Sequence, residues 1–199
     1  MLSLAKLRLR GPSTDPVGLA LNPAFYGTLE AKHAGGAKLL RTYDEETLEW
    51  IDIARAVMDG TQPLVFFELG AGFGLWSSRF HVMTEALGRE LGHMVLVEAD
   101  PKHYSWIRQH MMHNSIPESR YTALNVAVAD HNGQEYFYTH MAQNAGTDGG
   151  EWYGQSLARE AHEPKSKILR RFSVGRQHTK LYRGWGSTKV ECRTLSKLL

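Results

Sequence analysis

The chain has 199 residues, a formal net charge of +2 and a mean hydropathy of −0.37. This length suits one domain with a sizeable core and is too short for two domains of ordinary size. No stretch approaches the run of about 18 apolar residues that a membrane helix needs. Lys6, Arg8 and Arg10 interrupt the leucine-rich N-terminus, so no signal-peptide core forms. We therefore expect a cytoplasmic protein without a membrane partner.

The basic residues gather near the C-terminus. Between Pro164 and Arg193, nine Lys and Arg residues stand against one acid, Glu191, and the rest of the chain is net negative. Such a segment attracts anionic partners, including nucleic acid, although a solvated basic face is the simpler interpretation. Aromatic residues that could stack on bases lie among these cations, namely Phe172, Tyr182 and Trp185. An RNA-binding or RNA-methylating module is therefore one alternative function.

Residues 1–41 contain several prolines and glycines without sustained periodicity, which predicts an irregular N-terminal extension. A domain over residues 42–199 follows. Thr42 and Glu45 have the spacing of a capping box and indicate the start of a helix that ends at Gly60. Its predicted buried face comprises Leu48, Ile51, Ala54 and Met58.

Three strands are expected after this helix. LVFFEL, residues 64–69, is an uninterrupted apolar run, which is typical of a strand covered on both faces in a parallel sheet. MVLVEA, residues 94–99, repeats the pattern, and residues 121–128 form a plausible third strand. The Asn132-Gly133 turn would lead that strand to an antiparallel partner at residues 135–140.

Helical patterns separate the three strands. After the first strand, apolar residues recur with one helical stripe at Trp76, Phe80, Met83 and Leu87. Asp100 and Pro101 then provide a helix N-cap and a first helical position, and the helix should continue to Asn114. Alternating strands and helices predict an α/β fold with a right-handed, doubly wound parallel sheet. Ligands of such sheets bind at the carboxyl ends of the strands.

The glycine-rich turn GAGFG, residues 70–74, stands at that edge. Leu75 and Trp76 follow it in place of Gly-Lys-Ser or Gly-Lys-Thr, which excludes a phosphate-binding P-loop. The dinucleotide fingerprint G-x-G-x-x-G needs its third glycine one residue after Gly74. Glu68 would also repel a dinucleotide pyrophosphate, by about 3 kcal/mol at ~6 Å and an effective dielectric near ~20.

S-adenosylmethionine reverses the sign of this interaction. Its amino-acid end carries an ammonium group and its reacting centre is a sulfonium, so Glu68 can attract it. Glu98 ends the next strand, where a carboxylate can accept both ribose hydroxyls of an adenosine ligand. These two acids together favour S-adenosylmethionine as the cofactor.

Three segments, FELGAGFGLWSSRF, VLVEADPKHYSWIRQHMMHN and NVAVADHNGQEYF, resemble successive blocks of the FkbM-type S-adenosylmethionine-dependent methyltransferases. The resemblance covers residues 65–137 and extends more loosely to residues 144–157 and to VECRTLSKLL. It implies a Rossmann-like class I methyltransferase sheet and methylation of a hydroxyl oxygen on a sugar, polyketide or other small acceptor. It also implies the cofactor contacts: Glu68, Gly70, Gly72 and Gly74 around the methionine end, Glu98 on the ribose, and Ala99, Ala127 and Val128 beside the adenine.

Members of this family continue past the TLSKLL-like helix start with further strands and an acidic block, whereas this sequence stops at Leu199. The apolar strand LVFFEL also has predicted neighbours on one side only. We therefore expect the C-terminal strands of the sheet to lie outside this sequence. A non-catalytic, cofactor-binding remnant is a further alternative function.

No catalytic residue can be assigned from the sequence. Candidates for a general base near the strand ends or in loops are Asp130, His131, His140, Asp148 and Glu151. His103, His110 and His113 lack a further ligand at a suitable spacing, so we interpret them as a solvated helix face and predict no metal. Cys192 has no sequence neighbour that would make it a nucleophile, and we interpret it as a structural thiol.

Overall fold

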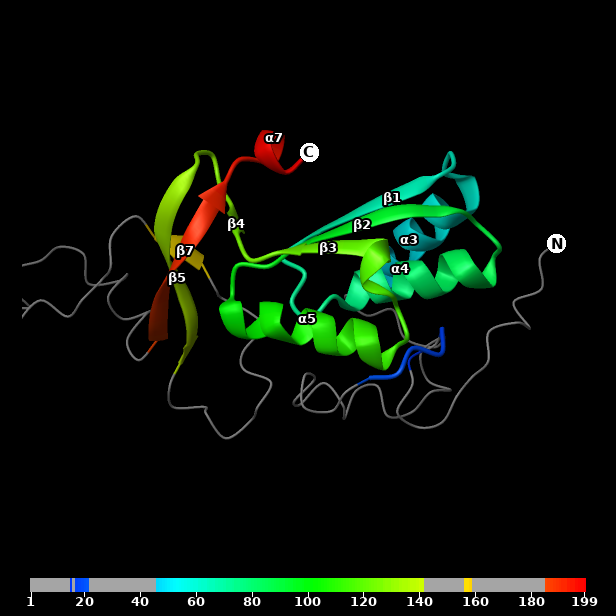
Figure 1. Ribbon diagram of the computed structural model, residues 1–199, viewed down its shortest axis with the longest axis horizontal. Coiled ribbons are helices and arrows are strands. Elements are labelled where there is room, and N and C mark those ends of the chain that lie inside the picture. The colour runs from blue at the N-terminus through cyan, green and yellow to red at the C-terminus, as the bar shows by residue number, and fades with distance from the viewer. Residues whose placement is uncertain (1–14, 16, 22–45, 142–155, 159–184) are drawn as a thin grey trace, which may run out of the picture.

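The computed structural model describes residues 15, 17–21, 46–141, 156–158 and 185–199. These residues form a three-stranded sheet in the order β1-β2-β3 and a four-stranded sheet in the order β4-β7-β5-β6. Figure 1 shows the two sheets side by side along the long axis of the molecule, with helices α4 and α5 beneath the first. None of the described helices combines the length and apolarity that crossing a bilayer requires.

The first sheet has the predicted parallel topology. Strands β1 (Leu64–Leu69), β2 (Leu91–Val97) and β3 (Tyr121–Leu124) pair in parallel, with β2 in the centre. Because all three strands point the same way, their carboxyl ends share one edge of the sheet. The glycine turn follows β1 at that edge.

Helices α4 (Leu75–Ala86) and α5 (Pro101–His113) cover one face of this sheet. The core between them contains fully buried apolar side chains from both layers, including Phe80, Leu96, Ile107 and Met111. The Asp100 side chain accepts a hydrogen bond from the backbone N–H of Lys102, so the predicted N-cap of α5 is confirmed. The short 3-10 helix η3 (Glu118–Arg120) leads into β3.

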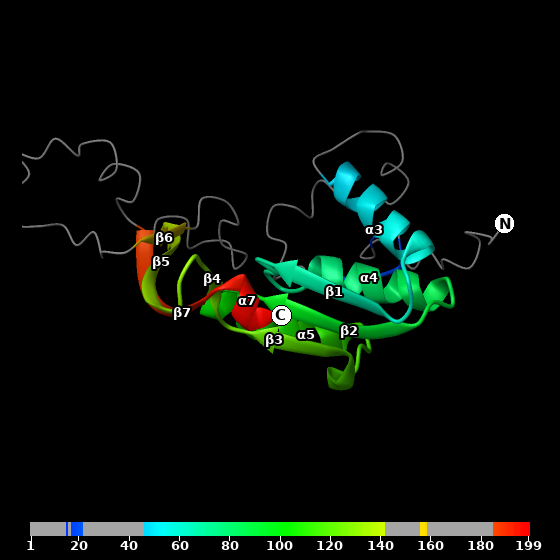
Figure 2. The ribbon, with the colours of Figure 1, turned by 90° about the horizontal axis from the view of Figure 1, so that it is seen from above.

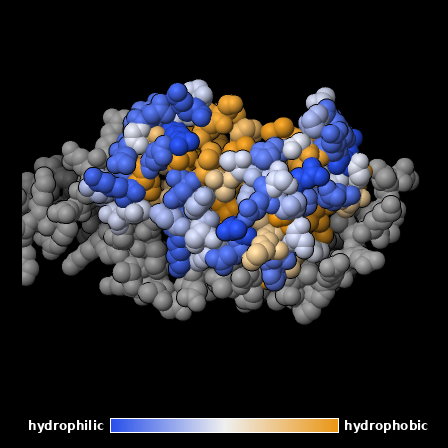
Figure 3. All heavy atoms as spheres, viewed as in Figure 1, coloured by the Kyte–Doolittle hydropathy of each residue, from blue (hydrophilic) through white to orange (hydrophobic). Residues whose placement is uncertain are grey.

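The opposite face of β1 is not covered by the described residues. Val65, Phe67 and Leu69 are 57%, 36% and 48% exposed, whereas Leu64 and Glu68 on the other face are buried. Figure 2 views this bare face, with α4 and α5 behind the strands. Figure 3 shows hydrophobic side chains gathered along the same upper side of the molecule. The predicted coverage of β1 on both faces is therefore not observed among the described residues. Within them β1 pairs with β2 alone, so its other edge is open as well.

Helix α3 (Thr47–Asp59) lies beside α4 and ends at the predicted place, but its buried face was predicted wrongly. Ile53 and Val57 are buried, whereas three of the predicted core positions are exposed, namely Leu48, Ile51 and Met58. The face is selected by packing on α4, which the apolar spacing of α3 alone does not specify. The predicted capping box at residues 42–45 lies outside the described residues.

The predicted third strand is broken in two. Asn125 turns the chain, and its side-chain amide donates hydrogen bonds to the carbonyls of Glu98 and Ala99, at 2.8 and 3.2 Å. Strand β3 therefore remains in the first sheet, while β4 (Ala127–Val128) joins the second.

The second sheet differs from the predicted hairpin. Strand β5 (Gly133–Met141) does follow the Asn132-Gly133 turn, but β7 (Trp185–Arg193) lies between it and β4. Strand β7 pairs in parallel with β4 and antiparallel with β5, and β6 (Ser156–Ala158) extends the sheet beyond β5. The short helix α7 (Leu195–Leu198) follows β7.

Part of the predicted irregular extension packs on this domain. Asp15 is buried and accepts a 3.1 Å hydrogen bond from Nε of Arg79, which is itself 1% exposed. The Arg79 guanidinium lies over two indole rings, 4.4 Å from the Trp50 centroid and 4.2 Å from the Trp76 centroid. It also pairs with Glu46 at 3.1 Å. Arg79 therefore joins Asp15, the start of α3 and α4 through one buried cation.

Candidate functional site

The glycine turn has the backbone conformation that its sequence suggests. Gly70, Gly72 and Gly74 all have positive φ angles, of 76°, 58° and 84°. A Cβ atom on Gly74 would lie 2.7 Å from a Leu96 methyl and 2.8 Å from the Met111 methyl, so this glycine permits close helix-to-strand packing. A Cβ on Gly70 would meet nothing within 4 Å. The space beside the Gly70 Cα is therefore open.

The structure shows what Glu68 contacts. Its carboxylate accepts hydrogen bonds from the backbone N–H groups of Trp76 and Ser77, at 3.2 and 2.8 Å, and from the Ser77 hydroxyl at 2.5 Å. Glu68 therefore reaches from the end of β1 across the turn and caps the first turn of α4. An anion at a helix N-terminus is stabilised by the free N–H groups and the helix dipole. In this conformation Glu68 fixes the shape of the glycine turn.

Glu98 connects the second strand end to the same turn. One carboxylate oxygen accepts a 2.6 Å hydrogen bond from the Gly72 N–H, and the other accepts a 2.7 Å bond from the Asp100 N–H. The turn is further held by the N–H groups of Gly70 and Ala71, which both donate to the Val97 carbonyl. The two predicted acids and the glycines thus form one hydrogen-bonded unit at the carboxyl edge of the sheet.

Burial shifts the pKa of both carboxyl groups. Glu68 is 9% exposed and Glu98 is 5% exposed. Burial raises the pKa of each carboxyl group to about 7, against the lowering effect of their hydrogen bonds. A cationic ligand beside them would favour the ionised forms, because an opposite charge within a few ångströms stabilises a carboxylate.

The predicted adenine contacts separate into two kinds. Ala127 is buried in a cluster with Phe137, Val190 and Cys192, and Ala99 packs against that cluster. Val128 is 37% exposed and pairs with Arg193 in the β4-β7 ladder. The structure thus places Ala99 and Ala127 together, where the first sheet meets the second, and Val128 on the other side of the strand.

The histidines of α5 do not form a solvated face, so that interpretation is wrong. His103 and His110 are buried, and only His113 is exposed. The His110 ring stands edge-on to Phe73 with ring centroids 4.9 Å apart, and burial lowers its pKa to about 3. A neutral, buried His110 therefore packs against the glycine turn through Phe73.

Two candidate bases, Asp130 and His131, lie between β4 and β5. The Asp130 carboxylate is 2.7 Å from His131 Nδ1, and His131 Nε2 is 3.3 Å from a Glu135 oxygen. The structure also places Cys192 beside His131 and Glu135. Sequence reasoning missed this group because Cys192 is far from the other two in the chain. Burial raises the pKa of the Cys192 thiol, so it is not an activated nucleophile in this state.

Several predicted residues cannot be placed. Asp148 and Glu151 lie outside the described residues. Most of the basic segment does too, including all its cations from Lys165 to Arg183, and so do the side chains of His140 and Trp185.

A hollow of about 420 Å³ lies near the turn before β5 rather than at the glycine turn. It is lined by Asn132, Gly133, Gln134, Glu191, Cys192, Arg193 and Lys197.

Comparison with known proteins gives only distant structural matches. No protein-family model and no curated protein matches the chain. A SAM-dependent methyltransferase from Agrobacterium tumefaciens aligns with 43% of this chain and 25% of its own, with a TM-score of 0.33 and 17% identity. An uncharacterized ACR superfamily protein from Burkholderia thailandensis aligns with 59% of this chain and 35% of its own, with a TM-score of 0.32 and 15% identity. This chain thus spans well under half the length of either structure.

Proposed function

We propose that the chain binds S-adenosylmethionine at the carboxyl edge of β1 and β2 and serves a methyltransferase. The observation that carries the proposal is the hydrogen-bonded unit of Glu68, Glu98 and the glycine turn. Apart from Gly70 and its chain neighbours, no atom of the described residues lies within 4 Å of the place where a Cβ on Gly70 would stand, so the backbone there is accessible. The side chains of the unit supply two carboxylates rather than cations. Two buried acids disfavour a pyrophosphate and favour an ammonium or sulfonium.

The ligand would lie across the two strand ends. Its methionine portion passes over Gly70, where no side chain fills the space, with Glu68 attracting its positive charge. Its ribose hydroxyls bond to Glu98, which ends the neighbouring strand. The adenine extends toward Ala99 and the start of the second sheet.

The reaction we propose is transfer of the methyl group to a hydroxyl oxygen of a sugar, polyketide or other small acceptor. An oxygen lone pair attacks the methyl carbon in line with the carbon–sulfur bond, and that bond breaks. The sulfonium becomes the neutral sulfide of S-adenosylhomocysteine, and the hydroxyl proton passes to a base or to water. Alignment of the oxygen with the methyl carbon supplies much of the acceleration of such a step.

Binding and turnover are tested separately. Calorimetry with S-adenosylmethionine, S-adenosylhomocysteine and NADH measures the ligand class, and we expect the first two to bind and NADH not to. Preferential binding of NADH would contradict the proposal. Formation of S-adenosylhomocysteine is then followed with a panel of hydroxyl-bearing acceptors. Binding without turnover on any acceptor would limit the function to cofactor binding.

A further inference from the structure

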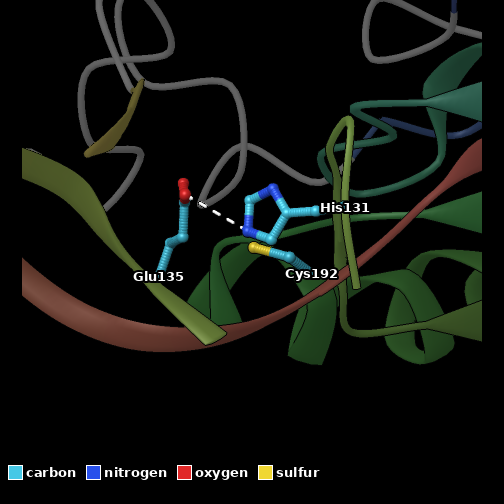
Figure 4. A group of neighbouring side chains, drawn as sticks. All are labelled: His131, Glu135 and Cys192. Atoms are coloured by element: carbon cyan, nitrogen blue, oxygen red, sulfur yellow. Dashed lines mark ion pairs between the residues drawn. The ribbon is translucent and has the colours of Figure 1, made fainter. Parts of the chain in front are cut away.

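We propose that His131, Glu135 and Cys192 bind one divalent transition-metal ion, with zinc as the best match to their chemistry. The three residues offer an imidazole nitrogen, a carboxylate oxygen and a sulfur, and these atoms all lie within 4.8 Å of one another. Figure 4 shows the three side chains converging from the turn before β5, from β5 itself and from β7. The proposal is independent of cofactor binding at the glycine turn.

The second sheet brings these residues together by its register. Gly133 pairs with Cys192, and Glu135 lies two residues beyond Gly133 on the same face of β5. Glu135 and Cys192 are therefore diagonal neighbours on one face of an antiparallel pair, where side chains are within reach of each other. His131, in the turn before β5, closes the group from the side.

The spacing of the atoms suits a tetrahedral ion. Zinc lies about 2.0–2.2 Å from nitrogen or oxygen ligands and about 2.3 Å from sulfur, which puts neighbouring ligand atoms roughly 3.3–3.6 Å apart. The distance from His131 Nε2 to Glu135 Oε1 is 3.3 Å. The Cys192 sulfur lies within 4.8 Å of both atoms, so it moves closer to them when an ion binds. Three protein ligands leave a fourth position for water or another ligand.

Asp130 provides the support that metal-binding histidines usually have. Its carboxylate is 2.7 Å from His131 Nδ1, so Nδ1 can donate a hydrogen bond and leave the Nε2 lone pair directed at Glu135. A carboxylate behind a histidine ligand fixes its tautomer and increases its basicity.

The two sheet residues are buried and the third is accessible. Cys192 is 1% exposed, Glu135 is 9% exposed, and the His131 side chain is 39% exposed. An ion can therefore enter from the His131 side. On binding, the Cys192 thiol loses its proton to solvent and the thiolate bonds to the metal.

Cobalt(II) titration of the metal-free 199-residue chain tests the site, because cobalt reports both geometry and a sulfur ligand in its absorption spectrum. We expect one equivalent to bind with a thiolate-to-cobalt charge-transfer band. Cys192→Ser should lose this band, and His131→Gln and Glu135→Gln should each weaken binding by at least about tenfold. Asp130→Asn should weaken binding about 10–100-fold with the band retained.

Matched controls separate the site from general metal binding. Glu191→Gln removes an exposed acid next to Cys192, and His113→Gln removes an exposed histidine of α5; both should bind like the parent. Because His131 is partly exposed, His131→Gln remains informative even where Cys192→Ser fails to fold, as checked by circular dichroism. Absence of the charge-transfer band in the parent, or parent-like affinity of His131→Gln, would overturn the proposal.

Discussion

The Glu98 carboxylate accepts a 2.6 Å hydrogen bond from the backbone N–H of Gly72. This bond ties the end of β2 to the turn that follows β1, while Glu68 ties the same turn to the start of α4. Two acids from neighbouring strands thus hold one glycine turn in place before any ligand arrives. For the proposed cofactor site, this preorganisation lowers the ordering cost of binding.

Replacing Glu98 should weaken cofactor binding and also loosen the glycine turn, because both Glu98 oxygens accept backbone N–H groups and an amide nitrogen cannot. Glu98→Gln keeps the size of the side chain but removes its charge, and hydrogen bonds to charged groups contribute about 1.5–3 kcal/mol. We expect the affinity for S-adenosylhomocysteine to fall about 10–100-fold, measured by calorimetry. Glu90→Gln is the control, because Glu90 is exposed and directly precedes β2 at the opposite edge of the sheet.

Glu98→Gln with the affinity of the parent protein would place the ligand away from the second strand end. Unchanged affinity would therefore contradict the assigned ribose contact, whatever the stability of the variant.

The raised pKa of Glu68 predicts a specific pH dependence of stability. Its pKa is 4.5 in the unfolded reference and about 7 in the fold, so the folded state holds the proton more tightly. The stability from this group is fully present below 4.5 and is lost as the pH rises through about 7. Glu68→Gln cannot lose a proton, so its stability relative to the parent should increase with pH, by about 1–3 kcal/mol.

Urea unfolding of both proteins from about pH 4 to about pH 8 measures this difference, because this range spans the reference pKa of 4.5 and the folded pKa of about 7. Comparison of the pair is necessary because burial lowers the pKa of His103 and His110, which has the opposite effect on the pH profile. A constant stability difference across the range would show that Glu68 ionises normally.

The glycines should respond differently to the same substitution. Gly74→Ala places a methyl group against Leu96 and Met111 in a left-handed conformation, and we expect a loss of about 2–5 kcal/mol from strain and overpacking. Gly70→Ala meets no neighbour, so we expect only about 1–2 kcal/mol from its backbone. Gly70→Ala should nevertheless abolish cofactor binding, because its methyl occupies the approach of the ligand.

Denaturant unfolding and calorimetry of both variants check these outcomes. Tight cofactor binding by a folded Gly70→Ala protein would be incompatible with the assigned path of the ligand.

Arg79→Met should be strongly destabilising. The substitution leaves Asp15 buried without its cation, and breaking a buried ion pair by removing one partner costs about 3–5 kcal/mol. Arg108→Met is the matched control, since the Arg108–Glu118 pair is exposed and such pairs contribute about 0–1 kcal/mol. The free energy of unfolding of each variant is the measurement, and equal losses would refute the structural role of Arg79.

Local sequence patterns predicted the first sheet well. The apolar runs, the Asp100-Pro101 helix start and the glycine turn each depend on neighbouring residues, and the structure confirms the parallel strands they imply. The hydrogen-bond partners of Glu68 were not predictable in the same way. A strand-end acid can face a ligand or cap a helix, and its side-chain conformation decides between these contacts.

Long-range contacts account for the remaining differences. Strand β7 inserts beside β5 from residues far along the chain, so the predicted hairpin gave no indication of it. Asn125 broke the third strand because its side chain bonds to carbonyls at the end of β2. The buried face of α3 depends on its packing against α4. Each of these outcomes requires knowledge of a partner element that local periodicity does not contain.

The most direct test of the cofactor site is a nuclear magnetic resonance titration of the ¹⁵N-labelled protein with S-adenosylhomocysteine, in which the backbone amides of Gly70 and Gly72 are followed. We expect both amide signals to shift in proportion to saturation, while the amides of the second sheet around Gln134 remain in place. Saturable binding that leaves Gly70 and Gly72 unchanged, or equivalent shifts with NADH, would contradict the account.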